Sequence, residues 1–213
     1  MEKADARKVR VKAIIRILKK TYPGVRLALD FNTPLELLVA LILAAQCTDS
    51  RVNQVTPGLF RKYRKAKDWM DEDRTVLEHE IHSTGFFRQK AASIQKCAAA
   101  LVERFNGEVP RKPEDLLTLP GVGRKTANIL RGNAFGDPAI GVDTHVARVS
   151  FRLGLTRQTE PDKIESDLTE VVPRAEQVKF CSLIQRHGRE VCVARKPGCE
   201  TCGLEELCPR TGV

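Results

Sequence analysis

Four cysteines near the C-terminal end restrict the fold of that segment more than any other feature of the sequence. Cys192, Cys199, Cys202 and Cys208 follow the spacing C-x6-C-x2-C-x5-C, and Pro209 comes directly after the last of them. The Pro and Gly residues between them favour tight loops. Four thiols in so short a segment can converge on one centre, so we expect residues 192–208 to fold around a metal site.

The spacing of the cysteines leaves two kinds of metal site open. Zinc sites often use two separated C-x2-C pairs. This run has a single C-x2-C pair flanked by lone cysteines, which is closer to the four-thiolate ligation of an iron–sulfur cluster. The other three cysteines, Cys47, Cys97 and Cys181, lie in helical patterns and are expected to be small buried apolar residues.

The charge composition indicates a polyanionic partner. Lys and Arg number 36 against 27 Asp and Glu, a net charge of +9, and such an excess favours nucleic acid or an anionic membrane surface. The longest apolar run, Leu37 to Ala45, is too short to span a bilayer. The first residues lack the apolar core of a signal peptide. We therefore expect a cytoplasmic protein without a membrane segment, in which thiols stay reduced and disulfide bonds are disfavoured.

Helical periodicity runs through most of the chain. Apolar residues recur every three or four positions at 94–105 and at 164–172, which is the spacing of one helix face. Thr33-Pro34-Leu35-Glu36 has the form of a capping box with Pro at the first helical position, and it predicts a helix that continues to Ala45. Strand-like alternation is nearly absent, residues 139–142 being the nearest case. The sequence predicts an all-α fold of about ten short helices.

The segment Leu119–Ala127 lies between two predicted helices, residues 113–118 and 123–133. Gly121 and Gly123 permit a tight turn whose backbone N–H groups can bind a phosphate at the start of the second helix. In a basic chain this arrangement resembles a helix-hairpin-helix, which binds the DNA backbone without reading its sequence. That motif also occurs in proteins that have no catalytic role, so by itself it predicts DNA binding only.

Lys125 stands in the first turn of the second predicted helix, next to Arg124. The positive end of the helix dipole disfavours an ammonium at this position, which suits a lysine that acts as a nucleophile. With Arg124 and Arg131 nearby, a further contact to phosphate is an equally good interpretation of Lys125.

Asp143 directly precedes another predicted helix, so we expect it to be the N-cap residue. A carboxylate fixed by capping is also a rigid anion. Placed near a reacting sugar, it could stabilise positive charge on a sugar carbon or assist an amine.

In combination these segments resemble the endonuclease III family of helix-hairpin-helix DNA glycosylases. The hairpin with its lysine, the Gly-Val-Asp of residues 141–143 and the four-cysteine run carry the resemblance, which extends over nearly the whole chain. It implies two helical lobes with the DNA cleft between them. The expected lobes are residues 1–27 with 139–213, including the cluster segment 192–208, and residues 28–138, including the hairpin 119–127.

The resemblance implies an enzyme with two activities. It would remove oxidised or ring-saturated pyrimidines from duplex DNA as a glycosylase, and then cleave the strand by β-elimination as an AP lyase. Lys125 would be the Schiff-base nucleophile and Asp143 the catalytic carboxylate. The implied cofactor is a 4Fe-4S cluster on the four cysteines, and the implied partner is duplex DNA with damaged bases or abasic sites, bound by a monomer.

The resemblance also suggests which residues contact DNA. Gln46 matches the residue that fills the gap left by the extruded base, and His145 matches one near the base pocket. At a second wedge position this chain has Phe86 where the family usually has Leu, which leaves the base preference open. Apart from the resemblance, the charges of Arg195 and Lys196, between the first two cysteines of the run, predict a contact to the DNA backbone, and the alternative is that both are solvated charges on a loop.

Two other functions remain open at this point. One is a monofunctional glycosylase for mismatched or alkylated bases, in which Lys125 only contacts phosphate. The other is a non-catalytic DNA-binding module whose four cysteines hold structural zinc. The related adenine and mismatch glycosylases mostly lack a lysine at the hairpin position, so Lys125 argues against those branches.

Overall fold

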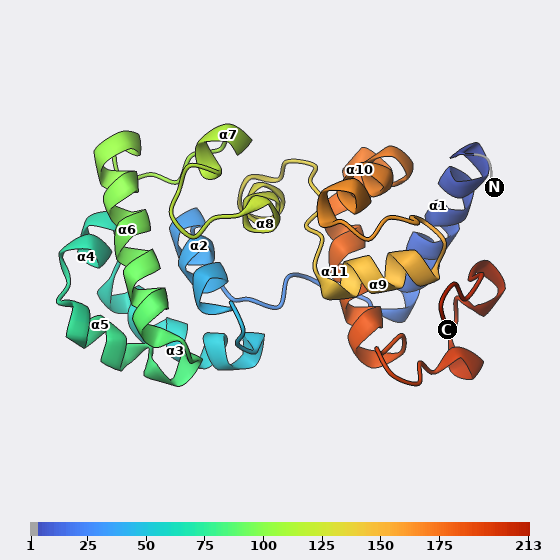
Figure 1. Cartoon of the computed structure of the whole chain (residues 1–213), viewed down its shortest axis with the longest axis horizontal. Helices are drawn as coiled ribbons and strands as arrows, with labels where there is room; N and C mark the ends of the chain where they lie inside the picture. Colours follow the sequence, from blue (N-terminus) through green and yellow to red (C-terminus); the bar gives the residue numbers. More distant parts are fainter. Residues whose placement is uncertain (1–3) are drawn as a thin grey trace. The chain divides into compact units, whose positions relative to one another are not determined.

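Helices make up all the regular secondary structure in the part of the chain that the computed structural model describes, residues 4–213 (Figure 1). The predicted all-α class is therefore confirmed. The α-helices are α1 Ala4–Thr21, α2 Pro34–Leu43, α3 Asp49–Lys62, α4 Ala66–Asp71, α5 Arg74–Glu80, α6 Phe87–Phe105, α7 Pro113–Leu116, α8 Arg124–Phe135, α9 Thr144–Arg152, α10 Pro161–Val171 and α11 Gln177–Glu190. The 3-10 helices are η1 His82–Thr84, η2 Arg174–Glu176, η3 Cys199–Thr201 and η4 Glu205–Leu207.

The chain divides into two compact units. One is the continuous segment Leu27–Gly136, which contains α2 to α8. The other joins the described residues up to Arg26 with Asp137–Val213, so that α1 belongs with α9, α10, α11 and the cysteine-containing end. Each unit has its own cluster of buried apolar side chains, as expected when each unit folds around its own hydrophobic core.

Helix α2 forms the centre of the unit 27–136. Leu37, Leu38 and Leu43 of this helix are almost completely buried. The long helix α6 packs against α2 and also against α4 and α5 (Figure 1). It buries Ile94 and Leu101, two positions of the predicted apolar face. The core thus gathers around the two most apolar helical stripes of this part of the sequence.

Helix α11 has the corresponding place in the other unit. It packs against α9 and α1 and buries Phe180, Leu183 and Ile184. The predicted apolar face at 164–172 is buried in the same core, with α10 supplying Ile164 and Leu168. The segment that carries the four cysteines follows directly after α11 (Figure 1).

The predicted start of α2 is confirmed for its N-cap residue and its first helical residue, but the second bond of the predicted capping box goes to Asn32 rather than to Thr33. Thr33 is the N-cap residue, Pro34 is the first helical residue, and the Thr33 hydroxyl accepts a hydrogen bond from the Glu36 N–H at 3.1 Å. The Glu36 carboxylate accepts from the N–H of Asn32, so two backbone donors at this helix start are satisfied by side chains. The helix ends at Leu43 rather than at the predicted Ala45, because the chain turns at residues 44–47.

The prediction for the isolated cysteines is correct for Cys97 and wrong for Cys47, and for Cys181 it holds for the thiol but not for the whole residue. Cys97 is buried in the face of α6, and burial raises the pKa of its thiol to about 12. Cys47 is partly exposed. Cys181 is also partly exposed as a residue, but burial raises the pKa of its thiol to about 12. A helical pattern indicates which residues share a face, but the depth of burial depends on what packs over that face.

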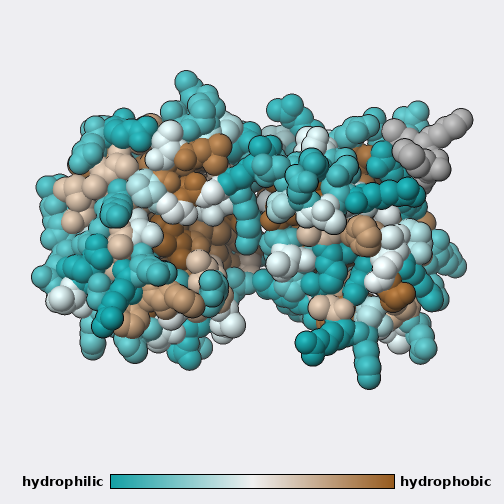
Figure 2. All heavy atoms as spheres, viewed as in Figure 1, coloured by the Kyte–Doolittle hydropathy of each residue, from teal (hydrophilic) through white to brown (hydrophobic). Residues whose placement is uncertain are grey.

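Hydrophilic residues cover most of the surface seen in Figure 2, and hydrophobic residues reach that face mainly in the unit 27–136. Within residues 4–213, no helix is both long enough and apolar enough to cross a bilayer.

The cap of α2 gives a stability prediction. Thr33→Ala removes the acceptor for the Glu36 N–H and should lower the free energy of unfolding by about 1 kcal/mol. Thr33→Ser keeps the hydroxyl and should stay close to the unsubstituted protein. Urea unfolding of the three proteins measures the difference, and equal midpoints for the Ala and Ser variants would show that the cap contributes nothing.

Candidate functional site

The predicted hairpin is present in the unit 27–136, between α7 and α8. Leu119 and Val122 are buried and anchor the turn in the core, and the Val122 N–H donates to the Leu119 carbonyl at 3.1 Å. Gly121 has a φ of +82°, a conformation that side chains with a Cβ rarely adopt. Gly123 is the N-cap residue of α8 and has no side chain to bond the first N–H groups. Such groups have no partner within a helix and suit a phosphate.

Lys125 is the second residue of α8 and is exposed. Its neighbours Arg124 and Gly123 are exposed as well, whereas Ala127 and Leu130, on the other side of the helix, are buried. The helix is therefore fixed through its apolar face while the amine of Lys125 stays at the surface beside the hairpin turn. This arrangement suits both a nucleophilic amine and a contact to phosphate.

Asp143 is the N-cap residue of α9, as predicted. Its carboxylate accepts a hydrogen bond from the Val146 N–H at 2.7 Å, and its carbonyl accepts from the Ala147 N–H at 2.8 Å. The side chain is half-buried, between the buried Val142 and Val146. The carboxylate therefore has a fixed direction, which a surface aspartate on a flexible loop would lack.

His145 lies in the first turn of α9 and is half-buried. Its Nδ1 is 3.2 Å from the guanidinium of Arg148. Arg148 also donates to the carbonyls of Gly188 and Cys192. One arginine thus ties the ring of His145 to the end of α11 and to the first cysteine of the run. The sequence did not identify Arg148, because the carbonyls that it binds lie forty or more positions away.

Gln46 and Phe86 both lie in the unit 27–136, on separate loops, and both have exposed side chains. Gln46 is in the turn after α2, and Phe86 is the N-cap residue of α6. Their backbones have positive φ values, 52° for Gln46 and 49° for Phe86. Non-glycine residues adopt this left-handed conformation at a cost, and such positions cluster in functional loops.

The four cysteines of the run lie together in the other unit. All four line one pocket, together with Arg152, His187 and neighbouring residues of the same unit. Cys192 follows α11, Cys199 begins η3, Cys202 follows η3 and Cys208 follows η4. The prediction that these residues converge on one place is consistent with this pocket.

Buried polar side chains surround the sulfur atoms. The Arg152 guanidinium lies 3.5 Å from the Cys192 Sγ, and the His187 Nε2 lies 3.5 Å from the Cys202 Sγ. The Cys208 thiol donates to the Arg152 carbonyl at 3.4 Å. Arg152 and His187 are both buried. Neither residue was a predicted site residue, although such outer contacts commonly orient the ligands of metal centres.

The electrostatics of this pocket favour a cationic centre. Burial raises the pKa of the Cys202 and Cys208 thiols, and the neighbouring cysteines raise it further. Four thiolates at this place would repel one another without positive charge between them. In the described part of the chain, no group of three or more His, Cys, Asp or Glu is arranged to hold a single ion. The presence of all four cysteines around one pocket matches the four-thiolate ligation of an iron–sulfur cluster.

Arg195 and Lys196 are exposed on the loop between Cys192 and Cys199. Arg152 holds the start of this loop, since its guanidinium donates to the carbonyls of Val193 and Ala194 at 2.7 and 2.9 Å. Two cations are therefore presented on a loop whose base is fixed.

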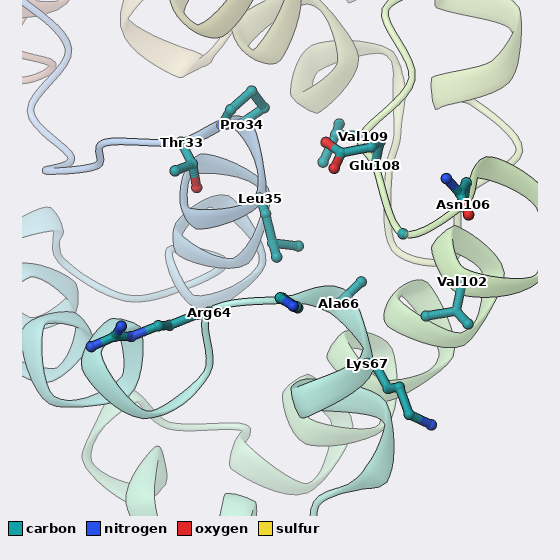
Figure 3. Close-up of a pocket in the computed structure, with 12 residues that line it drawn as sticks. Thr33, Pro34, Leu35, Arg64, Ala66, Lys67, Val102, Asn106, Glu108 and Val109 are labelled. Atoms are coloured by element: carbon teal, nitrogen blue, oxygen red, sulfur yellow. The ribbon is translucent and has the colours of Figure 1, made fainter.

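A second pocket, of about 530 Å³, lies in the unit 27–136. Its walls come from the start of α2, the segment that joins α3 to α4, and the end of α6 (Figure 3). None of the predicted site residues lines this pocket. The predicted site residues of this unit are exposed, either on turns or in the first turn of α8.

Comparison with known proteins gives consistent results. Residues 39–174 match the family model of the HhH-GPD superfamily base excision DNA repair proteins. Endonuclease III of Synechocystis is 53% identical over 210 residues, which cover 98% of this chain and 96% of that protein. Endonuclease III of Escherichia coli K12 is 38% identical over 195 residues, 92% of each chain.

A solved structure of a trapped endonuclease III–DNA covalent intermediate is 42% identical, with a TM-score of 0.90 and coverage of 96% of both chains. The match therefore includes the hairpin, the Asp143 segment and nearly all of the remaining sequence. The chain belongs to the endonuclease III family, within the HhH-GPD superfamily of base excision DNA repair proteins.

Proposed function

We propose that Lys125 and Asp143 are the catalytic residues of this base-excision repair DNA glycosylase and AP lyase, and that its substrates are oxidised or ring-saturated pyrimidines in duplex DNA. The observation that carries the proposal is the exposed amine of Lys125 at the start of α8, directly after the hairpin turn. A similar protein forms a covalent intermediate with DNA. A lysine amine next to a phosphate-binding turn is suited to make such a bond.

The reaction begins with the neutral amine of Lys125. Its nitrogen attacks C1′ of the sugar, the bond from C1′ to the base breaks, and the base leaves with the bonding electrons and takes up a proton. The carboxylate of Asp143, held by the Val146 N–H, stabilises the positive charge that develops on the sugar. The nitrogen then gives up a proton and its lone pair expels O4′, which takes up a proton as the C1′–O4′ bond breaks, and the opened sugar is joined to Lys125 by a protonated imine at C1′.

The imine makes a proton on C2′ acidic. Removal of this proton and departure of the 3′ phosphate with its bonding electrons break the strand by β-elimination. Water then hydrolyses the imine and returns the free amine of Lys125. The amine is regenerated, so the residue acts catalytically.

The same model gives roles to the remaining predicted residues. The turn with Gly121 and Gly123, together with Arg124, binds phosphates, and so do Arg195 and Lys196. Gln46 and Phe86 enter the base stack while the damaged nucleotide rotates outward, and His145 lines the pocket that receives it. We also propose that the protein acts as a monomer on chromosomal DNA in the cytoplasm.

Cys192, Cys199, Cys202 and Cys208 would hold a 4Fe-4S cluster, whose positive irons offset the charge of the four thiolates. The cluster would supply cross-links to a segment that has only two short 3-10 helices. Arg152 and His187 would orient the cysteines from outside, and the cross-linked loop would hold Arg195 and Lys196 in place.

The role of Lys125 can be tested by trapping. Lys125→Gln keeps a polar side chain but removes the nucleophile, so it should abolish both strand cleavage and the protein–DNA adduct formed with borohydride. Binding to duplex DNA should survive. If Lys125 is only a phosphate contact, the variant will instead keep its turnover at saturating DNA, and the salt dependence of its binding will fall by about one unit of slope.

The effect of the Asp143 charge on base excision can be measured separately from the effect of its N-cap on stability. Asparagine caps helices about as well as aspartate, so Asp143→Asn should leave the melting temperature nearly unchanged. It should reduce base excision by about a hundredfold or more, because a fixed negative charge is lost. Asp143→Ala, which loses the cap as well, is the matched control and should lower the melting temperature. Full activity in the Asn variant would rule out an electrostatic role.

The cluster can be tested on the purified protein. We expect it to be brown, to absorb broadly in the blue and to contain iron. Cys199→Ser removes one of four ligands and should lose iron and unfold the C-terminal segment, as seen by increased proteolysis there. Cys97→Ala, at a buried cysteine outside the run, should keep its iron. Colourless protein that contains zinc instead would contradict the assignment.

A further inference from the structure

Lys90 is a buried cation in the unit 27–136 that the reaction scheme leaves without a role. It lies in α6, and only 4% of its surface is exposed. Lysine is rarely buried to this extent, because removal of an ammonium from water is costly unless hydrogen bonds replace the water. Burial lowers the pKa of Lys90 accordingly.

The partners of this ammonium are two backbone carbonyls from different segments. The Lys90 Nζ donates to the Leu43 carbonyl at 2.8 Å and to the Thr84 carbonyl at 2.7 Å. Leu43 is the last residue of α2, and Thr84 is the last residue of η1. Carbonyls at the ends of helices lack partners within the helix and attract positive charge, so both bonds are favourable ones.

These two carbonyls lie at the bases of the loops that carry Gln46 and Phe86. Leu43 is three positions before Gln46, and Thr84 is two positions before Phe86. The backbone N–H of Lys90 also donates to the Phe86 carbonyl at 3.0 Å. One residue thus contacts both loops.

The side chains of Gln46 and Phe86 cannot fix these loops themselves, because both are exposed and both residues have left-handed backbone conformations. Such conformations persist only when the surrounding structure holds them. The bonds from the Lys90 ammonium supply this restraint, and they set the distance between the two loop bases, since both carbonyl oxygens bind the same nitrogen.

We propose that Lys90 is a positioning residue for base extrusion, which holds the loops of Gln46 and Phe86 at one fixed spacing so that both side chains enter the duplex together. The proposal rests on the proposed function, in which these two side chains fill the base stack. Lys90 itself does not touch DNA. It restricts the conformations of the two loops before DNA binds. Less conformational entropy is then lost when the loops enter the duplex.

The test compares two substrates that differ in whether a base must be extruded. Lys90→Met keeps the length and the apolar stem of the side chain but removes the donors. Single-turnover rates are measured on a duplex with an oxidised pyrimidine and on the same duplex with a preformed abasic site. We expect the rate on the oxidised pyrimidine, divided by the rate on the abasic site, to fall about tenfold or more. The reason is that only the oxidised pyrimidine has to be unstacked. An unchanged ratio would overturn the proposal.

A general loss of stability would lower both rates alike. Leu101→Ala is the matched control, since Leu101 is buried in the same helix but three turns away. It should destabilise the unit and leave the ratio unchanged. If Lys90→Met does not yield folded protein, Lys90→Gln serves in its place. Its amide is one bond shorter and cannot reach both carbonyls, so the same fall in the ratio is expected, and an unchanged ratio again overturns the proposal.

A double-mutant cycle tests the route through Gln46. If Lys90 acts by placing Gln46, then Gln46→Ala should slow base excision much less in the Lys90→Met protein than in the unsubstituted protein. Fully additive effects would overturn the proposal. Failure of the proposed function is distinguishable, since in that case the unsubstituted protein itself would show no excision, no trapped adduct or no effect of Gln46→Ala.

Discussion

Buried cationic side chains that donate to backbone carbonyls hold the irregular segments of both units. Lys90 binds the ends of α2 and η1, and Arg152 binds the carbonyls of Val193 and Ala194. Loops have no regular hydrogen-bond pattern of their own, and the carbonyls at helix ends have no partner within the helix. A cation with several donors satisfies such carbonyls. The carbonyls in turn replace the water lost by the cation, which lowers the cost of burying its charge.

The loops held in this way include backbone conformations that are unfavourable in isolation. Gln46, Phe86 and Lys196 are non-glycine residues with positive φ, and all three are exposed residues with proposed roles at DNA. A side chain that must point outward into a ligand cannot bury itself to stabilise its own loop. The restraint therefore has to come from neighbouring residues that do not contact the ligand themselves.

In each unit, a helix that is fixed by its buried face carries a polar residue with a proposed catalytic role. Lys125 is carried by a helix that is fixed through Ala127 and Leu130, and Asp143 is fixed by the N–H of Val146. In each case the apolar face of one helix decides where the polar group stands. The stability of each core and the placement of a proposed catalytic residue thus depend on the same helix, α8 in one unit and α9 in the other.

Much of the fold and of the candidate site could be predicted from the sequence, because the relevant interactions are local. Helical periodicity gave the all-α class, the spacing of Thr33, Pro34 and Glu36 gave the start of α2, and Asp143 was expected as an N-cap. The hairpin glycines and the four cysteines were recognisable for the same reason. These features join residues a few positions apart, where the residue types alone limit the geometry.

The tertiary structure alone decided how the loops are held. The bond from Lys90 to Leu43 spans 47 positions, and that from Arg152 to Val193 spans 41. Nothing in the sequence around Lys90 distinguishes it from the surface lysines of this basic chain, just as nothing local separates the buried Cys97 from the partly exposed Cys47. Burial and long-range partners depend on which elements pack together, and that information lies in the whole chain rather than in any one segment.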